Sequence, residues 1–312
     1  MNNTQSYMIN APKMILLVGL PGSGKSTYTE KLKEEGVIIH SSDSVREELG
    51  DVNDQSKNEE VFRILHKRIK DDLKDGKSVC FDATNLNRRR RVAFLNELKN
   101  IPCKKICVLM ATPYEMCVCQ NFKRDRRVPV EVIWNMYKSF NVPCEQEGWD
   151  EIIVHYPNEE WKEYYGCVAD HINELCNFEQ ENHHHTLTLG EHMKKAGNYL
   201  FDILRKESDV VHAAFTHDIG KLECKEFKNG KGEPTEEAHY FNHHFVGSYK
   251  CLFFGYPSRV NKMYVSLLIE LHMKPHLEWK QSEKAKEKDR RLFGDRVIEE
   301  VMLIHQADIS AK

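Results

Sequence analysis

Short apolar runs alternate with longer amphipathic segments through the first half of the chain. The runs are continuous and rich in Val, Ile and Leu, as strands buried on both faces of a sheet must be. We expect strands at residues 14–20, 37–40, 78–81, 105–110 and 152–155. We expect helices between them at residues 25–35, 58–75, 89–99, 113–127 and 131–140. This alternation predicts an α/β domain with a parallel sheet and helices on both faces.

After Tyr156 the strand-like runs stop and helical periodicity takes over. Helices are expected at residues 189–205, 209–217, 242–254, 259–272 and 295–311. The Lys/Glu/Gln-rich stretch 280–291 is typical of a solvated helix or loop rather than of a site. A chain of 312 residues favours two domains. We therefore predict an α/β domain over residues 1–157, a join over 158–182 and an all-α domain over 183–312.

Composition and charge narrow the function classes. Charged residues make up 30% and hydrophobic residues 40%, which fits a globular protein. The net charge of −3 excludes a polycation, so nucleic-acid binding requires local basic patches. No apolar run approaches the roughly 20 residues of a membrane span, and residues 1–13 lack a signal-peptide core. Ten cysteines without clear zinc spacing are expected as reduced thiols, which predicts a cytoplasmic protein without membrane contact.

The sequence Gly-Leu-Pro-Gly-Ser-Gly-Lys-Ser occupies positions 19–26, after a predicted strand and before a predicted helix. This is the context that a phosphate-binding loop requires. Lys25 would contact the β- and γ-phosphates of ATP or another nucleoside triphosphate, and Ser26 would ligate Mg²⁺. The expected nucleotide-binding residues are Gly19, Gly22, Ser23, Gly24, Lys25, Ser26 and Thr27.

Polar residues follow the second and third predicted strands. Asp43 is placed to accept a proton from an attacking hydroxyl, or to cap the following helix. Arg46, one helical turn later, can bind a substrate phosphate. Asp82 is placed for a contact near Mg²⁺ or for holding the acceptor, and Thr84 and Asn85 could orient substrate.

Two basic segments lie near this predicted site. Arg88 to Arg91 indicate either a solvated helix start or a nucleic-acid contact. Residues 121–129 include Arg124, which could close on the triphosphate and neutralise charge in the transition state, or could lie on a charged surface helix.

Residues 12–157 resemble the 5′-kinase domain of the bacteriophage polynucleotide kinase. The resemblance rests on the loop, on Ser-x-Asp43-x-x-Arg46, on Asp-Ala-Thr-Asn-Leu-Asn from Asp82, and on Val-Pro-x-x-Val-Ile-x-x-Met-Tyr-Lys-Ser at 128–139. It implies catalytic roles for Lys25, Ser26, Asp43, Arg46 and Arg124. The lid segment departs from the family pattern, with Gln120 in place of an arginine, so Arg126 or Arg127 could substitute.

Spaced histidines and aspartates mark the second half. They are His192, His217, Asp218, His243, His272 and Asp308. Imidazole and carboxylate ligands suit divalent Mn, Fe, Co, Ni or Zn. Asp218 could bridge two such metals, an arrangement that activates water against a phosphate ester.

This pattern resembles the HD phosphohydrolase superfamily over residues 183–312. The resemblance implies one or two metals held by the six residues above, with Lys221 on the scissile phosphate. His185 is a candidate substrate contact. We expect the remaining histidines of the region to be ordinary core or surface residues: His183, His184, His239, His244, His276 and His305.

Together the two signatures predict a bifunctional enzyme that heals nucleic-acid ends. The first domain would phosphorylate a 5′-hydroxyl end, and the second would hydrolyse a 3′-phosphate or a 2′,3′-cyclic phosphate, with RNA favoured over DNA and a ligase as a possible partner. Two alternatives remain: a small-molecule kinase fused to a nucleotidase, and a non-enzymatic sensor of nucleotide and metal. Asp43 and the complete ligand set argue against the sensor.

Overall fold

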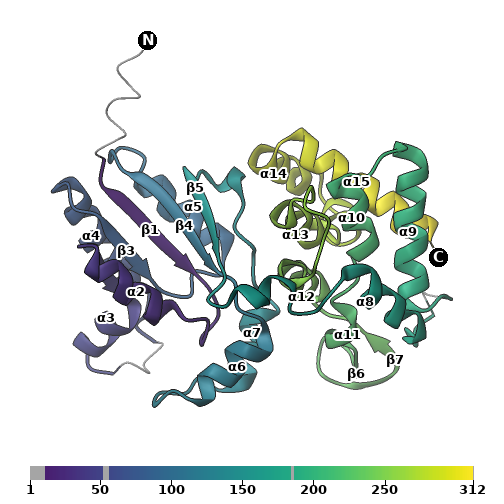
Figure 1. Ribbon diagram of the computed structural model, residues 1–312, viewed down its shortest axis with the longest axis horizontal. Helices are drawn as coiled ribbons and strands as arrows, with labels where there is room; N and C mark the ends of the chain where they lie inside the picture. Colours follow the sequence, from purple (N-terminus) through teal and green to yellow (C-terminus); the bar gives the residue numbers. More distant parts are fainter. Residues whose placement is uncertain (1–10, 52–55, 184–185, 312) are drawn as a thin grey trace, which may run out of the picture. The chain divides into compact units, whose positions relative to one another are not determined.

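The computed structural model describes residues 11–51, 56–183 and 186–311 and divides the chain into two compact units (Figure 1). Unit 1 comprises residues up to Ile133 together with Glu147–Pro157. Unit 2 comprises Trp134–Gln146 and Asn158–Lys312. Among the described helices, none combines the length and the apolar character that a membrane span requires.

Unit 1 contains a five-stranded parallel sheet in the order β2-β3-β1-β4-β5. The strands are β1 (Lys13–Val18), β2 (Ile38–Ser41), β3 (Val79–Asp82), β4 (Lys104–Met110) and β5 (Glu151–His155). In the central strand β1, every residue from Met14 to Val18 is buried. The chain crosses between β1 and its two neighbours, so the carboxyl end of β1 faces the place where the strand order reverses, where ligands of such sheets bind. The α/β prediction is confirmed, and all five strands lie where the apolar runs are.

Helices connect the strands of this sheet. They are α2 (Lys25–Glu34), α3 (Ser42–Glu48), α4 (Asn58–Lys74), α5 (Arg88–Glu97), α6 (Tyr114–Phe122) and α7 (Val130–Tyr137), the last of which crosses the boundary between the units. In α4, buried Val61, Leu65, Ile69 and Leu73 recur every four residues and form one apolar face. The helix α3 was not predicted, because it has only seven residues and begins directly after β2.

A buried ion-pair cluster joins the start of α5 to the segment before β5. Arg91 donates to both carboxylate oxygens of Glu147, at 2.6 and 2.7 Å, and Arg88 donates to one of them at 3.2 Å. The three residues are at most 6% exposed. Arg88 and Arg91 are therefore neither a solvated helix start nor a nucleic-acid contact, as the sequence had suggested, whereas Arg89 and Arg90 are exposed.

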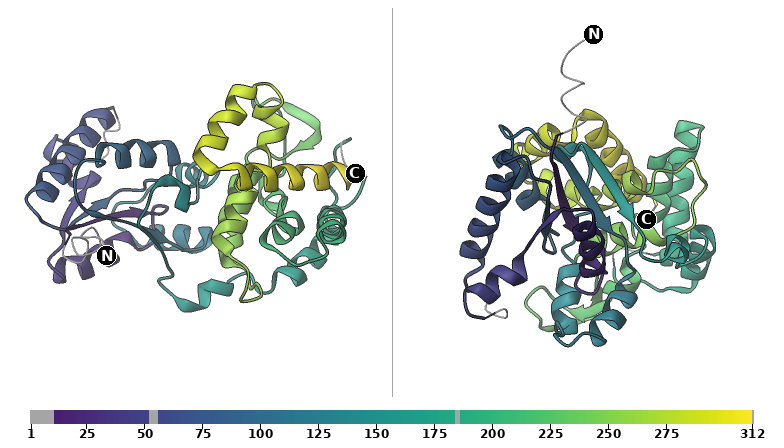
Figure 2. Two further views of the ribbon diagram at one scale, coloured as in Figure 1. Left: turned by 90° about the horizontal axis from the view of Figure 1, so that it is seen from above. Right: turned by 60° about the vertical axis from the view of Figure 1, so that its left-hand side comes forward.

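Unit 2 is helical apart from one hairpin of β6 (Glu226–Lys228) and β7 (Pro234–His239), which the sequence analysis did not predict. Its principal helices are α8 (Val168–Glu174), α9 (Leu189–Leu204), α10 (Asp209–Thr216), α11 (Lys221–Cys224), α12 (His243–Lys250), α13 (Lys262–Leu271), α14 (Glu283–Phe293) and α15 (Asp295–Ser310). The chain also forms short helical turns. They are η1 (Glu145–Glu147), η2 (Glu159–Glu163), η3 (Leu175–Asn177), η4 (Cys251–Phe253) and η5 (Pro275–Trp279). The helix α15, yellow in Figure 2, packs on α9, α10 and α14.

The two units are not continuous in the sequence, whereas the sequence analysis expected one domain, a join and a second domain in succession. Residues of the expected join form η2, α8 and η3, and α8 packs on α9. The segment Trp134–Gln146 clusters with unit 2. There, the Tyr137 hydroxyl donates to the Val246 carbonyl, and Phe140 packs on Tyr249 with ring centroids 4.6 Å apart. The segment thus supports α12.

We predict that Glu147→Gln lowers the free energy of unfolding by about 3–5 kcal/mol, because it leaves two buried guanidinium groups without their counter-charge. The paired arginines outweigh burial and lower the pKa of Glu147. Its contribution is therefore full above the ordinary carboxyl range and is lost as the pH falls through the lowered value. Urea denaturation at pH 7 measures the effect.

The matched control is Arg89→Ala, an exposed arginine of the same helix, which should change stability by less than about 0.5 kcal/mol. Equal stability of the Glu147 variant and the control would show that the buried cluster does not stabilise the fold.

Candidate active sites of the two units

The loop between β1 and α2 has the backbone shape of a phosphate cradle. Gly22 and Gly24 have φ of +81° and +89°, in the left-handed region that favours glycine. A Cβ at Gly22 would also lie 2.2 Å from the carbonyl oxygen of Cys117. Ser26 and Thr27, in the first turn of α2, are exposed and accessible to a ligand. The loop therefore opens onto the amino end of a helix, where backbone N–H groups and the helix dipole favour an anion.

Lys25 folds back along this loop. Its Nζ donates to the carbonyl oxygens of Gly19 and Leu20, at 3.0 and 2.8 Å. Burial lowers the pKa of Lys25, and the Asp82 carboxylate opposes that shift. The ammonium group is thus held at the centre of the cradle.

The segment after β3 supports the loop from behind. Asn85 Nδ2 donates to the Leu17 carbonyl at 2.8 Å, and the Gly19 N–H donates to the Thr84 carbonyl at 3.0 Å. Asn85 has a positive φ of 47°, which places its side chain against β1. These contacts give Thr84 and Asn85 a role in supporting the loop, and their contact with substrate stays a prediction.

Asp43 lies between two arginines. Its Oδ1 accepts from Arg46 at 3.0 Å, and its Oδ2 pairs with Arg126 at 3.0 Å. The cap of α3 is Ser41, whose hydroxyl accepts from the Asp43 N–H, so Asp43 is not the helix cap. Its side chain is 49% exposed and can meet a substrate. Of the two lid arginines that the sequence left open, Arg126 contacts Asp43, whereas Arg127 donates to the Arg124 carbonyl.

Charges of both signs converge beside the loop. Burial raises the pKa of Asp82, Lys25 lowers it, and Asp43 raises it further. Arg124 lies within the electrostatic reach of both Lys25 and Asp82. The structure therefore places the predicted residues Lys25, Asp43 and Arg124 close enough for their charges to interact.

In unit 2 the six predicted histidines and aspartates come together from five helices. His192 lies within α9, His217 ends α10, His243 begins α12, His272 ends α13 and Asp308 lies in α15. Asp218 follows His217, and Gly220 allows this turn to approach α12, because a Cβ there would lie 2.2 Å from the His243 carbonyl oxygen. All six side chains are buried.

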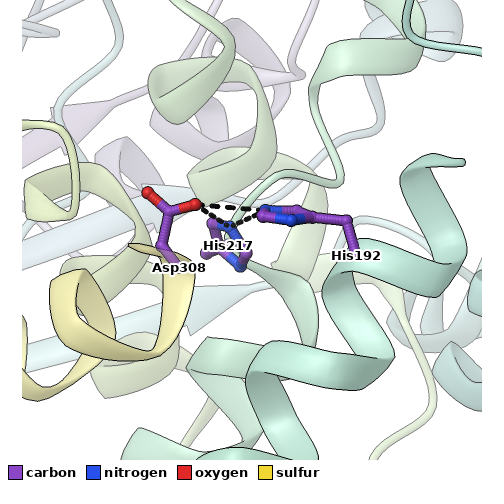
Figure 3. A group of neighbouring side chains, drawn as sticks. All are labelled: His192, His217 and Asp308. Carbon is purple, nitrogen blue, oxygen red and sulfur yellow. Dashed lines mark hydrogen bonds and ion pairs between the residues drawn. The ribbon is translucent and has the colours of Figure 1, made fainter. Parts of the chain in front are cut away.

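The six residues form two groups of three. His192, His217 and Asp308 offer ligand atoms within 4.8 Å of one another (Figure 3), and so do Asp218, His243 and His272. Asp218 joins the groups through its two oxygens. Its Oδ2 lies 3.4 and 3.3 Å from Nε2 of His192 and His217, and its Oδ1 lies 3.1 and 3.6 Å from Nε2 of His243 and His272.

The ring orientations favour cations at both groups. Nδ1 of His217, His243 and His272 each lies 2.7–2.8 Å from a backbone carbonyl three residues earlier, so each Nδ1 is the donor nitrogen. Their Nε2 atoms then carry lone pairs. Yet Nε2 of His243 and Nε2 of His272 face each other at 3.2 Å beside the Asp218 carboxylate. Without a positive charge between them this arrangement is repulsive, so the residues fit a metal ion.

The shifted pKa of His217 also indicates that this cluster favours positive charge. Burial disfavours a charged His217, but Asp218 and Asp308 outweigh it and raise its pKa to about 10. Burial and the neighbouring imidazoles lower the pKa of His272 to about 4, so this ring stays neutral. The two carboxylates thus favour positive charge at the first group.

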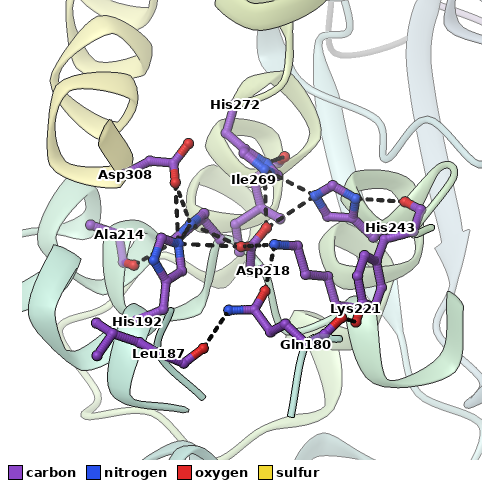
Figure 4. A network of polar contacts seen from close by, with 12 residues as sticks. Gln180, Leu187, His192, Ala214, Asp218, Lys221, His243, Ile269, His272 and Asp308 are labelled. Carbon is purple, nitrogen blue, oxygen red and sulfur yellow. Dashed lines mark hydrogen bonds and ion pairs between the residues drawn. The ribbon is translucent and has the colours of Figure 1, made fainter. Parts of the chain in front are cut away.

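Lys221 lies at the edge of the cluster (Figure 4). Its Nζ pairs with Asp218 Oδ2 at 2.7 Å and donates to Gln180 Oε1 at 2.9 Å. Gln180 is itself fixed, since its Nε2 donates to the Leu187 carbonyl and its carbonyl accepts from the Tyr240 hydroxyl. Lys221 is thus a positioned cation next to the predicted metal ligands.

Sequence reasoning missed His276. Its Nε2 lies 2.8 Å from Asp308 Oδ2. The other oxygen, Asp308 Oδ1, points to His192 at 3.1 Å (Figure 4). His305 Nδ1 in turn lies 3.0 Å from His276 Nε2. The available signal was spacing, because His276 is four residues after His272 and His305 is three before Asp308.

The other histidines of the region divide as follows. His183 pairs with Glu237 at the surface, and His239 stacks on exposed Phe241. His244 is partly buried beside His243, and burial lowers its pKa well below the ordinary value. His184 and His185 lie outside the described residues.

Comparisons with known proteins concern the P-loop unit. The AAA domain family matches residues 14–143. The L-seryl-tRNA(Sec) kinase of Methanococcus maripaludis is 31% identical over 143 residues, which are 44% of this chain and 56% of that protein. A protein of Autographa californica nuclear polyhedrosis virus, named as a bifunctional polynucleotide kinase/RNA ligase, is 28% identical over 160 residues, 45% of this chain and 23% of that protein.

Among solved structures, a chain of the Pnkp1/Rnl/Hen1 RNA repair complex aligns with a TM-score of 0.37 and 22% identity, over 43% of this chain and 44% of that one. The chain thus spans about half of the length of the first curated relative and less of the second. These two sequence relatives carry kinase in their names, and kinases of this kind use a nucleoside triphosphate with Mg²⁺. The comparisons confirm a kinase-type P-loop domain in this part of the chain.

We predict that His276→Ala weakens Mn²⁺ binding by about 10- to 100-fold, because Asp308 loses the partner that orients it. His276→Gln keeps an N–H at a similar reach and should recover much of the affinity. Isothermal titration with Mn²⁺ measures both variants, with exposed Gln306→Ala on the same helix as Asp308 as the control. Unchanged affinity in the alanine variant would mean that His276 does not position the ligand.

Proposed function

We propose that the chain is a bifunctional enzyme that heals nucleic-acid ends. Unit 1 transfers the γ-phosphoryl group of ATP to a 5′-hydroxyl end, and unit 2 hydrolyses a 3′-phosphate or a 2′,3′-cyclic phosphate. The observation that carries the proposal is the presence, on one chain, of a complete phosphate cradle with Asp43 beside it and a buried cluster of four histidines and two aspartates. The first adds a phosphate and the second suits its removal.

In the kinase unit, the roles follow from position. Lys25 and the loop hold the β- and γ-phosphates, and Ser26 ligates Mg²⁺. Asp43 accepts the proton of the attacking hydroxyl once Arg126 turns to the triphosphate. Arg46, held by Asn58 at 2.8 Å, binds a phosphate of the acceptor. Arg124 neutralises charge on the transferring group.

In the hydrolase unit, one metal would be held by His192, His217, Asp218 and Asp308, and a second by Asp218, His243 and His272. When bound, such divalent metals supply Lewis acidity toward a phosphate oxygen and activate water. Lys221 holds a phosphate oxygen of the substrate by charge and hydrogen bond. His276 keeps Asp308 Oδ1 directed at the cluster.

The pairing of the two activities favours RNA. Ribonuclease cleavage leaves a 5′-hydroxyl and a cyclic phosphate, and both must change before a ligase can seal the break. The viral relative whose name joins polynucleotide kinase to RNA ligase supports this pathway and a ligase partner. Because Arg88 and Arg91 are buried, they do not form the basic groove that would have supported a polynucleotide substrate. A small-molecule kinase fused to a nucleotidase would use the same two sites, so the assay must offer both kinds of substrate.

We predict that the two activities separate by mutation. Lys25→Ala should lower phosphoryl transfer to a 5′-hydroxyl oligoribonucleotide by about 100-fold or more and leave 3′-phosphate hydrolysis intact. Asp218→Ala should do the reverse. End-labelled oligonucleotides and free nucleosides, each with ATP and Mn²⁺, provide the measurement, and exposed Lys31→Ala on α2 is the control. Parallel loss of both activities in a folded variant would indicate a single shared site.

We predict two metals per chain in the wild type. Asp218→Ala should remove both, because its two oxygens face the two groups, whereas His243→Ala and His272→Ala should reduce the number toward one. Elemental analysis of the purified protein measures the stoichiometry. One metal in the wild type, unaffected by the His243 and His272 substitutions, would leave a mononuclear site of His192, His217, Asp218 and Asp308.

A further inference from the structure

A cavity of about 510 Å³ lies between η5, the start of α14 and the end of α15. Its volume is within the range of roughly 300–1,000 Å³ that is usual for small-ligand pockets. Trp279, Met302 and Ile309 supply apolar wall, and Lys280 and Lys286 supply cationic wall. Glu283 contributes an acidic side chain. The combination of a flat apolar surface with two ammonium groups suits a ligand that is part ring and part anion.

The charges on α14 are arranged so that these two lysines remain available. Glu287 pairs with Arg290 and Arg291, and Asp289 accepts from the Trp279 indole and lies 3.6 Å from Lys274. Within the described part of the chain, neither Lys280 nor Lys286 forms an ion pair. The stretch 280–291, interpreted from its sequence as an ordinary solvated segment, therefore presents uncompensated positive charge to the cavity.

The indole that forms part of the wall is fixed. Trp279 is 6% exposed, and its Nε1 donates to Asp289 Oδ2 at 2.9 Å. It belongs to η5, a single turn of π-helix, a conformation that is frequent at functional sites. Only a small part of this fixed ring, beside Met302, is open to the cavity, so a nucleobase would contact it without further ordering of the side chain.

The cavity adjoins the proposed metal site through one side chain. His276 lines the cavity, and its Nε2 also lies 2.8 Å from Asp308 Oδ2. Asp308 is the most exposed of the six clustered side chains, at 11% against 1–6% for the others. The cavity and the cluster are therefore one side chain apart, because His276 belongs to the wall of the first and contacts a ligand residue of the second.

We propose that this cavity binds the terminal nucleotide of the strand that unit 2 hydrolyses. The base packs on Trp279 and Met302, and Lys280 and Lys286 hold the phosphodiester that joins this nucleotide to the next one. The inference rests on the proposed function and deepens it. It makes the substrate a polynucleotide end rather than a free phosphate monoester, because a small ester could reach the metals without occupying the cavity.

The test compares two substrates of the Mn²⁺-loaded full chain, a short 3′-phosphorylated oligoribonucleotide and p-nitrophenyl phosphate. The variant Lys280→Ala/Lys286→Ala should raise the KM for the oligonucleotide by about tenfold or more, since each lost contact to a charged group is worth about tenfold. The kcat for the oligonucleotide and all constants for p-nitrophenyl phosphate should stay unchanged. The control is Lys284→Ala/Lys288→Ala, which removes two exposed lysines of the same helix that do not line the cavity.

A second variant, Met302→Trp, fills the cavity without altering charge and should weaken the oligonucleotide reaction alone. Unchanged oligonucleotide KM in both variants, an equal effect of the control lysines, or loss of activity toward both substrates would each overturn the inference. Wild-type protein that hydrolyses neither substrate would overturn the proposed function and the inference with it. Wild-type protein that hydrolyses both, with cavity variants that behave like it, would overturn the inference alone.

Discussion

The helical unit is organised around a single carboxylate that divides its two oxygens between two pairs of imidazoles. Asp218 lies in a turn that only a glycine two residues later allows to approach α12, and four helices besides α10 contribute the side chains that surround it. A buried carboxylate in contact with four rings is costly unless positive charge is present. The lysine at 2.7 Å supplies one such charge, and the geometry leaves the remainder to be supplied by ions. Binding of the proposed metal ions would therefore be coupled to the folding of this unit.

Other buried charged groups of the protein are paired with protein groups of opposite charge. In unit 1, Glu147 is neutralised by two arginines and an indole N–H, so the cluster is complete within the protein. In unit 2, the ammonium group of Lys250 contacts Glu223 and lies 4.9 Å from the centre of the Tyr165 ring. That contact ties α11, which begins with Lys221, to α12, which begins with His243. Glu147 and Lys250 have protein partners of opposite charge. Among these buried charges, the Asp218 carboxylate is the one whose surrounding imidazoles suit an added cation.

Sequence reasoning succeeded where the determining information is local. The strands of unit 1 are short apolar runs, and the loop at positions 19–26 is a continuous motif, so both could be predicted. The six clustered residues of unit 2 could be selected because the adjacent His217-Asp218 pair, the spaced histidines and the distal Asp308 resemble the HD phosphohydrolase pattern. The hairpin β6–β7 was missed because its residues are mostly polar and exposed and show no clear alternation.

Reasoning failed where a residue's role depends on a distant partner. Arg88 and Arg91 are an ordinary basic run in the sequence, and only Glu147, more than fifty residues later, makes them core residues. His276 is likewise unremarkable until α15 places Asp308 beside it. The Arg88/Arg91–Glu147 pairing has no signature in composition or periodicity, and the spacing of His276 from His272 does not by itself identify Asp308 as its partner, because both pairings depend on tertiary packing.

Residues 134–146 belong to unit 2, although the chain segments before and after them belong to unit 1. Asn141 and the Val142 N–H both donate to the Glu270 carboxylate, at 3.0 and 3.1 Å, two residues before His272. The strand β5, which completes the sheet of unit 1, follows this segment. A single break in the chain therefore cannot release two whole modules, because either the sheet loses its edge strand or α13 loses the donors that satisfy its buried glutamate. The two units are interleaved in the gene, and recombination that exchanged one of them would have to carry two separate pieces.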